Sequence, residues 1–534
     1  MKKTILKNAA VILLPVAIVA IVMFCIWYLA LPAITLQSKG FAWFIAVTLL
    51  LLTAGLTFVI RMEDWSETAE QILWGILALV VLAIIITSIV SWTCFHATKA
   101  CAVADITVNE ATITDDFPDL TEAENVANLA LVDLDTARML GDKKIAGLKN
   151  SSWYEVDTEY NLIKYNGKYY RLSFLDYGGY LKYRKAKHEG IPGYILVECT
   201  PSGGIVTQNA TLVELNEPIK YSEGAYWGYD LKRHLRYQYP GYMFDTSFPE
   251  IDEEGVPYYV TGVLRPTAVW GIKTIKSFIL TNAQTGESTE YWVNEAPNWI
   301  DHVFSLNYLT TIAEWHYTLR NGWWNSVTAK TGVWHTSYHY RSSHMNSDDG
   351  KYAIFHGYSS AVIDGNVQFY TGLTAANAAE SNLGWLLIDT STGKMTQYAV
   401  VGAEESSAQA AVEQLVSAYR YQATFPLPAN INGEASYIMC LKGDAGLVQA
   451  YAICNVQNYA IAVQAETLPK AIELYLNKLG YVVPEATADN ESTADYPQFD
   501  PDDIVGVHTV EVNGTTQWYY EMANGELYVV VKVK

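Results

Sequence analysis

The chain has 534 residues, enough for several domains, since one domain usually takes about 100 to 200 residues. Its 56 acidic residues outnumber its 35 basic residues, which gives a formal net charge of −21. Such an excess of negative charge repels nucleic acid and anionic lipid headgroups, so we expect no nucleic-acid partner.

Three apolar segments come first, at residues 9–31, 41–60 and 72–95, and none of them contains a charged residue. Each is close to the roughly 20 residues that a helix needs to cross a bilayer core. We therefore predict an N-terminal transmembrane domain over residues 1–100. The first segment also has the basic start of a secretory signal, but its long apolar run and the lack of a small-x-small cleavage site favour an uncleaved anchor.

Basic residues near the ends of these segments predict their orientation. One side carries Lys2, Lys3, Lys7 and Arg61, and the other side carries Lys39 and Lys99. Because the more basic side faces the cytoplasm, we expect a multi-pass protein of the cell membrane with a cytoplasmic N-terminus. Residues 101–534, with 52 acidic and 29 basic residues, are then extracytoplasmic and attached to membrane lipid.

The six cysteines predict no disulfide framework. Cys25 falls in the first apolar segment, Cys94 and Cys101 fall at the membrane edge, and Cys199 has no partner nearby in sequence. Cys440 and Cys454 lie on two runs that predict a hairpin, in which Cys440 faces a residue near Gln449 and is out of register with Cys454. We expect buried apolar side chains instead.

The exported region begins with a polar, acidic stretch at residues 101–120, which predicts a tether. A helix is expected from Thr121 to Leu140, because Thr121 and Glu124 form a capping box in which each side chain satisfies a free backbone donor.

A first β-rich α+β domain is predicted over residues 121–270. Asn166-Gly167 separates two alternating apolar runs and is a strong hairpin signal, since both turn positions need positive φ. Further strands are expected within residues 190–199 and 256–264. Between them, a short helix is expected to end at Pro240.

Residues 384–400 repeat the pattern of residues 277–293, with an apolar run, an Asn or Asp (Asn282, Asp389), a Thr-Gly pair and a later Tyr. A capping Asn or Asp and a glycine with positive φ are typical of a strand-turn-strand unit. A helix-compatible segment follows each copy. We therefore predict a duplicated hairpin-helix module, because one such unit cannot bury its apolar face alone. The two modules span residues 271–380 and 381–484.

A further strand and helix at residues 459–480 is a candidate third copy without the Thr-Gly turn, in which Thr467 is the expected N-cap. Residues 485–503 are acidic and poor in apolar side chains, which predicts a linker. Two Asn-Gly turns in residues 504–534 predict a C-terminal three-stranded meander.

Several phrases of the exported region resemble an uncharacterised group of bacterial membrane proteins that have N-terminal membrane helices and a large β-rich exterior region. They include "GIPGYILVE", "FPEIDEEGVPYYV", "TGESTEYWVNEAPNWIDHVF" and "NGEASYIMCLKGDAG". The resemblance covers residues 125 to 480 and implies no catalytic residue. The repeated hairpin followed by a helix also resembles the PepSY-type module of exported bacterial proteins, which implies a sensor or a protease regulator.

Two groups of side chains are candidate metal ligands. His335, His339 and His344 lie close in sequence, and imidazoles suit zinc when a carboxylate completes the site. Asp252 and Glu254 offer the oxygen ligands that calcium takes. Neither group matches a recognised motif, so the alternatives are hydrogen-bonded or exposed histidines and a solvated acidic turn.

The predicted fold class is α+β, with a three-helix transmembrane segment followed by a large β-rich exterior region. The chain has no catalytic motif, so we predict a non-enzymatic cell-surface protein without a cofactor that forms homo-oligomers or binds a protein partner. One alternative is a surface hydrolase of cell-wall polymer, because paired carboxylates could cleave glycosides and several tryptophans could stack on sugars. These are Trp315, Trp323, Trp324 and Trp334. The other alternative is the PepSY-type sensor or regulator.

Overall fold

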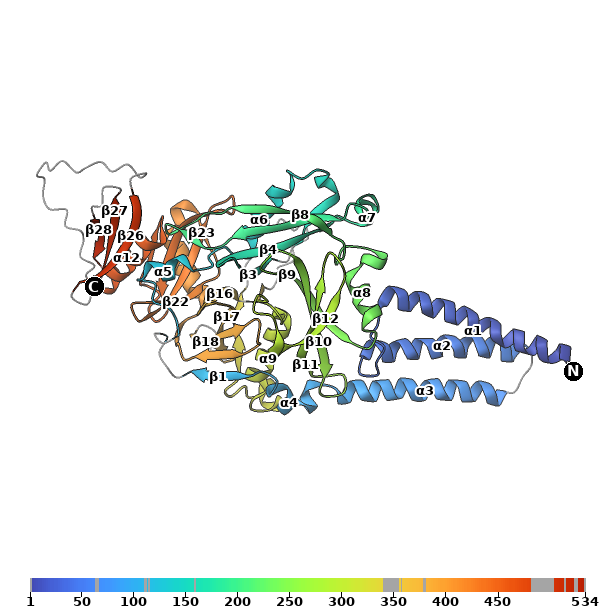
Figure 1. Cartoon of the computed structure of the whole chain (residues 1–534). Helices are drawn as coiled ribbons and strands as arrows, with labels where there is room; N and C mark the ends of the chain where they lie inside the picture. The colour runs from blue at the N-terminus through green and yellow to red at the C-terminus, as the bar shows by residue number, and fades with distance from the viewer. Residues whose placement is uncertain are drawn as a thin grey trace, which may run out of the picture.

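Three long helices extend from one end of a β-rich body in the computed structural model (Figure 1). They are α1 (Lys2–Ala30), α2 (Lys39–Met62) and α3 (Glu67–Val90). The structure describes residues 2–534 except 63–66, 110–112, 114–115, 158–159, 340–354, 357, 378–380, 482–503, 513–514, 523–526 and 533–534. Its mixture of helices and sheets confirms the predicted α+β class.

Residues Ile12–Ala30 of α1 and the whole of α2 and α3 are long and apolar enough to cross a membrane, by length and composition. Their outward faces expose large apolar side chains, such as Leu29, Phe58 and Leu79 at 78%, 65% and 67%. Apolar surface of this extent suits lipid better than water. The helices therefore agree with the membrane association predicted from the sequence.

The stretch after α3 is bound to the body, so its prediction as a tether was wrong. It contains η1 (Thr93–Phe95), α4 (Ala97–Cys101) and β1 (Ile106–Asn109). β1 pairs in parallel with β19 (Met395–Tyr398), and the Phe117 ring packs 5.6 Å from Trp385 and 5.2 Å from Tyr398. A strand of four residues gains its stability from a partner far along the chain, which its own composition does not indicate.

The single helix predicted from Thr121 to Leu140 is also wrong. Two helices are present, α5 (Ala123–Ala127) and α6 (Leu134–Ile145), and the latter begins where Asp133 Oδ1 accepts from Thr136 N. Between them, residues 130–132 are buried, and Leu131 N donates to Cys199 O at 3.0 Å. Burial of this apolar segment against the first sheet interrupts the helix.

The first sheet has the strand order β2-β4-β5-β8, and β3 also pairs with β4. Its strands are β2 (Tyr154–Val156), β3 (Asn161–Tyr165), β4 (Lys168–Tyr177), β5 (Ile191–Glu198) and β8 (Ala210–Ile219). Around it lie η2 (Ser151–Trp153), α7 (Tyr180–Ala186), β6 (Pro201–Ser202), β7 (Ile205–Val206), η3 (Trp227–Tyr229) and α8 (Leu231–Gln238). Asn166 and Gly167 both have positive φ, which confirms the predicted β3-β4 hairpin.

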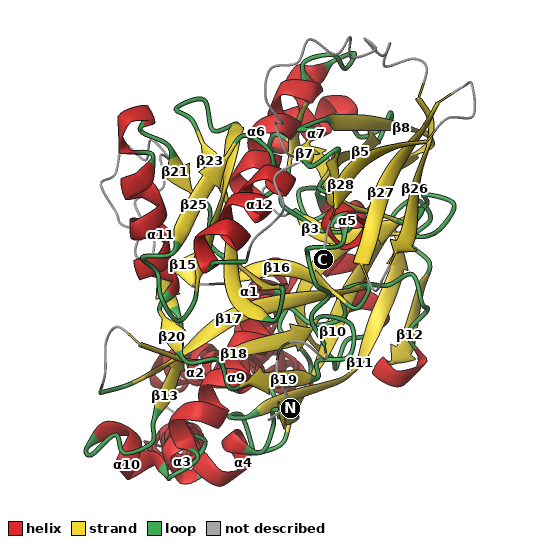
Figure 2. Cartoon of the chain, turned by 90° about the vertical axis from the view of Figure 1, so that its left-hand side faces the viewer, coloured by secondary structure: helices red, strands yellow, loops and turns green. Residues whose placement is uncertain are grey.

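The second sheet is a four-stranded meander in the order β12-β11-β10-β9, followed by helices. Its elements are β9 (Met243–Ile251), β10 (Pro257–Pro266), β11 (Lys273–Asn282), β12 (Ser288–Trp292), η4 (Val293–Glu295), α9 (Leu306–Leu319) and α10 (Trp323–Val327). Leu309, Ile312 and Tyr317 of α9 are buried in one cluster with side chains of this sheet and of the next one. Helix α9 lies beside β18 and β19 of the next sheet (Figure 2).

The third sheet has seven strands, including β1 and β19. Its other strands are β13 (Trp334–Thr336), β16 (Ser359–Ile363), β17 (Asn366–Ala375), β18 (Ser381–Asp389) and β20 (Gly402–Ala403). A separate pair is formed by β14 (Tyr338–His339) and β15 (Phe355–His356), and α11 (Glu405–Leu415) and η5 (Ser417–Tyr419) follow the sheet.

Both repeated segments form the predicted hairpins, each followed by a helix. Asn282 Oδ1 accepts from the backbone N–H groups two and three residues later in the β11-β12 turn, and Asp389 Oδ1 does the same in the β18-β19 turn. Gly286 and Gly393 follow with φ of 78° and 72°. Asn455 accepts the same two hydrogen bonds in the turn that precedes residues 459–480, the candidate third copy.

The fourth sheet is covered on both faces, which explains its nearly continuous apolar strands. Its elements are β21 (Gln422–Ala423), β22 (Leu427–Ile431), β23 (Glu434–Lys442), β24 (Val448–Asn455), β25 (Ala462–Ala465) and α12 (Leu468–Leu479). Ile438 and Cys440 pack in the cluster that contains α12, whereas Tyr437 and Cys454 pack in the cluster that contains α11. Cys440 and Cys454 therefore point to opposite faces.

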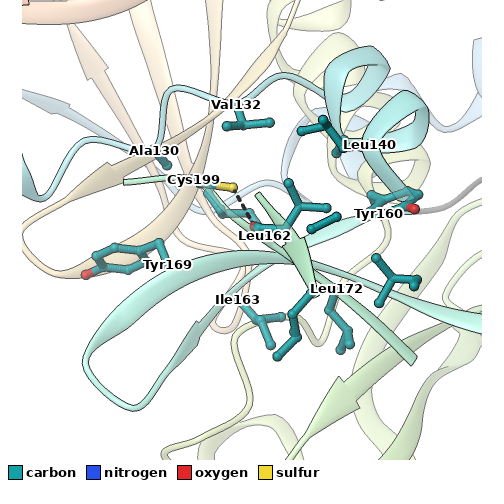
Figure 3. Packing of buried hydrophobic residues seen from close by; sticks show 14 of the residues in the cluster. Ala130, Val132, Leu140, Tyr160, Leu162, Ile163, Tyr169, Leu172 and Cys199 are labelled. Atoms are coloured by element: carbon teal, nitrogen blue, oxygen red, sulfur yellow. Dashed lines mark hydrogen bonds between the residues drawn. The ribbon is translucent and has the colours of Figure 1, made fainter. Parts of the chain in front are cut away.

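All six cysteines are free, as predicted, and Cys199, Cys440 and Cys454 are buried. Cys440 is paired with Tyr451, two residues from Gln449, and a bulge between Leu441 and Lys442 shifts the register. Cys199 lies in the largest core, among Ala130, Val132 and strands of the first sheet (Figure 3).

The predicted C-terminal meander is present as β26 (Ile504–Val512), β27 (Thr515–Met522) and β28 (Leu527–Lys532). The predicted acidic linker at residues 485–503 lies outside the described residues.

Candidate functional site

The body contacts the ends of the long helices through α8 and the β10-β11 hairpin (Figure 1). Helix α8 buries Leu231 and Leu235 in the body and carries Arg233 and Arg236. These arginines are three residues apart, so they lie on neighbouring positions of one helix face. Both reach the C-terminal end of α1.

Arg236 fixes the residue that ends α1. Its side chain is only 4% exposed, its Nε donates to Leu31 O at 3.0 Å, and its Nη1 donates to Pro240 O at 3.2 Å. The guanidinium also lies 4.7 Å from the centroid of the Phe244 ring. Leu31 has a φ of 47°, a conformation that is uncommon for a residue with a side chain. The arginine therefore holds an unfavourable backbone conformation at the exit from α1.

Arg233 adds a second contact one turn earlier on α1. Its Nη1 donates to Tyr28 O at 2.8 Å, and its guanidinium lies 4.0 Å from the centroid of the Tyr28 ring. Trp227 packs 6.2 Å from the same ring, and Tyr237 packs 5.7 Å from Trp27. Aromatic residues of this kind are typical of the level where lipid headgroups begin.

The β10-β11 hairpin makes the equivalent contact with the loop before α2 and with the residue that follows α3. Trp270 Nε1 donates to Leu36 O at 2.7 Å, and Trp270 N donates to Ser91 Oγ at 3.3 Å. A Cβ on Gly271 would lie 2.4 Å from Ser91 O, so only glycine allows this approach. Ile34 N also donates to Pro240 O at 2.7 Å. The body is thus joined to the ends of all three helices.

The charges of the junction favour this arrangement. Burial lowers the pKa of Arg236 to about 10, so the guanidinium stays charged near neutral pH. A positive charge at the C-terminal end of α1 interacts favourably with the helix dipole. Asp230 is the N-cap of α8 and accepts from Arg233 N at 2.6 Å, and burial raises the pKa of this carboxyl.

The structure does not gather the predicted zinc ligands into a described site. His335 lies on β13, with Nδ1 3.2 Å from Glu314 Oε2, and Thr336 N donates to Glu314 Oε1 at 2.7 Å. His339 belongs to β14, but its side chain lies outside the described residues, as does the whole of His344.

The predicted calcium ligands occupy the turn between β9 and β10. Asp252 Oδ1 accepts from Glu254 N at 3.1 Å and from Val256 N at 2.8 Å, while the Glu254 side chain is exposed. Among the residues that the structure describes, no three His, Cys, Asp or Glu side chains are grouped so as to hold a metal ion. The Asp252 carboxylate shapes the turn.

Two acidic side chains are buried, which their local sequence does not indicate. Glu250 is fully buried, and its Oε1 lies 3.0 Å from His302 Nδ1; burial raises the pKa of Glu250 well above its usual value and lowers that of His302 to about 4. Glu405 is 1% exposed and accepts from Tyr370 Oη at 2.5 Å, and burial raises its pKa. Burial beneath neighbouring side chains separates these groups from solvent, which suits a structural role better than catalysis.

No known protein family matches the chain, and a search of curated proteins also finds no match. The geometry of the junction is therefore the main basis for a functional proposal. In this junction, cationic and aromatic side chains hold the ends of the long helices.

The sequence contained one signal of this junction. Helix α8 carries Lys232, Arg233 and Arg236 directly before Pro240, which is unusual in an acidic region. The partners of these arginines lie 205 residues earlier in the chain, so no local pattern identifies them.

Proposed function

We propose that this protein is a non-enzymatic, membrane-anchored surface protein that holds its acidic body at a fixed position on the outer face of the cell membrane. α1, α2 and α3 cross the membrane, the N-terminus is cytoplasmic, and the body takes part in assembly. The single observation that carries this proposal is the junction itself, where Arg236 and Trp270 join the body to the helix ends. A body that moved freely on a tether would not need such buried contacts.

The body assembles as a homo-oligomer or with a protein partner through its sheet edges. β8 and β12 are the last strands in the order of their sheets. An edge strand presents backbone groups with which a second chain can pair. Trp292 at the end of β12 is 49% exposed, and exposed tryptophan is favoured in protein interfaces.

Residues 271–380 and 381–484 are proposed to be two copies of one module. The proposal is supported by the matching turns at Asn282 and Asp389 and by the helix that follows each hairpin. Two similar surfaces on one chain would offer two similar binding sites to a partner.

A surface hydrolase ranks below this proposal, because Glu250 and Glu405, whose pKa values are raised by burial, are closed off from solvent. The PepSY-type regulator rests on the resemblance of the hairpin and helix. Metal analysis of the purified protein addresses the zinc and calcium alternatives at His335 and Asp252. Stoichiometric metal that is lost in His335→Gln would favour a metalloenzyme.

The experiment for the assembly role measures the mass of the full-length protein in lipid nanodiscs and detergent over a range of concentrations. We expect an oligomer, or a protein partner that co-purifies, and we expect Trp292→Lys to weaken it. Tyr419→Lys is the matched control, since Tyr419 is 64% exposed and lies in η5, outside both of these edge strands. A strict monomer at high concentration, without a partner, would refute the proposal.

A further inference from the structure

The surface beside the outer end of α3 carries four exposed, large apolar side chains. Trp92 and Phe95 follow α3 directly and are 60% and 63% exposed. Trp324 and Val327 on α10 are 74% and 54% exposed. A soluble surface seldom exposes several such side chains together, so this patch indicates a binding surface.

The two segments meet at one place. A depression of about 380 Å³ is lined by Ser91, Trp92, Thr93, Cys94 and Trp323. Trp323 therefore connects α10 to the turn that follows α3, and its ring lies 4.9 Å from that of Trp324. The exposed residues of α10 lie beside the end of a helix that is long and apolar enough to cross a membrane.

The patch is supported from below by a small core. Ala100 of α4, Ala268 and Ile272 of the β10-β11 hairpin, and Leu319 of α9 form a buried cluster against which Trp323 packs. Gly322 precedes α10 with a φ of 86°, which turns the chain from α9 into α10. Trp324 and Val327 are thus presented by a fixed support.

The charges around the patch differ from those of the body. Residues 101–534 have 52 acidic against 29 basic residues, yet the exposed residues Lys99, Arg320 and Lys330 are all within four residues of Phe95, Trp324 or Val327 in the chain. Basic side chains beside tryptophan are the combination found where proteins meet phospholipid headgroups. Tryptophan favours this level because its ring is apolar while its N–H is polar.

We propose that Trp92, Phe95, Trp324 and Val327 insert into the outer leaflet of the membrane, with phospholipid headgroups in the depression between Trp92 and Trp323. The occupant is the lipid of the same membrane, because Trp92 continues directly from α3. This inference rests on the proposed function, in which α3 crosses that membrane. It adds a specific lipid-binding surface on the body, which fixes the body against the bilayer.

The test uses the full-length chain in nanodiscs, with Cys25→Ala, Cys94→Ser and Cys101→Ser to remove the cysteines that are not buried. A fluorescent label is placed at Trp324→Cys and, as a second position in case that variant does not fold, at Val327→Cys. The controls are Leu79→Cys on α3 and Tyr419→Cys, which are 67% and 64% exposed. The probe is phosphatidylcholine brominated either near the headgroup or near the chain end.

We expect a label at residue 324 or 327 to lose fluorescence with lipid brominated near the headgroup, and to lose less with lipid brominated near the chain end. The label at residue 79 is quenched by the chain bromines, and the label at residue 419 is unaffected. If residue 79 is quenched while residues 324 and 327 behave like residue 419, the lipid surface is refuted and the membrane anchor stands. The lipid surface is also refuted if the labels at residues 324 and 327 are shielded from water but are not quenched by bromine, since a protein would then cover them. If residue 79 is also unquenched, the proposed function itself fails.

Discussion

Replacing Arg236 by alanine should detach the end of α1 from the body. The substitution removes the hydrogen bonds from Nε to Leu31 O and from Nη1 to Pro240 O, and the side chain is 4% exposed. A hydrogen bond from a charged group contributes about 1.5 to 3 kcal/mol, so losing two of them should weaken the local structure by about 3 kcal/mol or more. Leu31 would also be freed to leave its positive φ.

Hydrogen exchange measured by mass spectrometry reports this local opening. The amide of Ile34 donates to Pro240 O at 2.7 Å, so the peptide that contains it should exchange about 100-fold faster in Arg236→Ala, since about 1.4 kcal/mol corresponds to a factor of ten. Lys232→Ala is the matched control, because Lys232 is an exposed residue of the same helix. Exchange in Arg236→Ala within about twofold of the parent would show that the arginine does not hold the junction.

Three further predictions concern single contacts. Burial raises the pKa of Glu405, so the stability that this group contributes is present below pH 4.5 and is lost as the pH rises through the raised pKa. Glu405→Gln should therefore gain stability relative to the parent as the pH rises above 4.5. A difference in unfolding midpoint that does not change with pH would contradict this prediction. Gly393→Ala should lower the free energy of unfolding by about 1 to 3 kcal/mol, because Gly393 has a φ of 72° and the new Cβ would lie 3.0 Å from the Phe304 ring. Gly228→Ala is the control and should have little effect, because the space around Gly228 is open. Trp270→Phe should lose the hydrogen bond to Leu36 O, which should reduce the local stability by about 1 kcal/mol. The measurement is faster amide hydrogen exchange over residues 36–38, and unchanged exchange there would argue against this contact.

Local signals allowed much of the fold to be predicted. The Asn166-Gly167 hairpin, the turns at Asn282 and Asp389, and the end of α8 before Pro240 depend on residues that are adjacent in sequence. The same is true of the three apolar helices, whose length and composition are sufficient. In each case the backbone conformation follows from a few neighbouring side chains.

The predictions that were wrong depended on distant contacts. Residues 101–120 looked like a tether because β1 finds its partner in β19, about 290 residues later in the chain. The helix predicted from Thr121 is interrupted because Leu131 is drawn into the first sheet beside Cys199. A tertiary contact outweighs local helix propensity when it buries apolar side chains.

The candidate site was beyond the reach of the sequence for the same reason. The arginines of α8 are visible, but their acceptors on α1 are 205 residues away, and Trp270 bonds to Leu36 O across 234 residues. The histidines attracted attention because His335 and His339 are near in sequence, yet His335 lies beside Glu314.

The most direct test of the account asks on which side of the membrane the body lies. A maleimide that cannot cross the membrane is added to intact cells that make either Tyr419→Cys or Glu67→Cys. Glu67 lies at the end of α3 that is far from the body. Both variants lack the three cysteines that are not buried. The account predicts that residue 419 is labelled in intact cells and residue 67 only after the cells are opened. Labelling of residue 67 in intact cells, with residue 419 protected until the cells are opened, would contradict the extracytoplasmic position of the body.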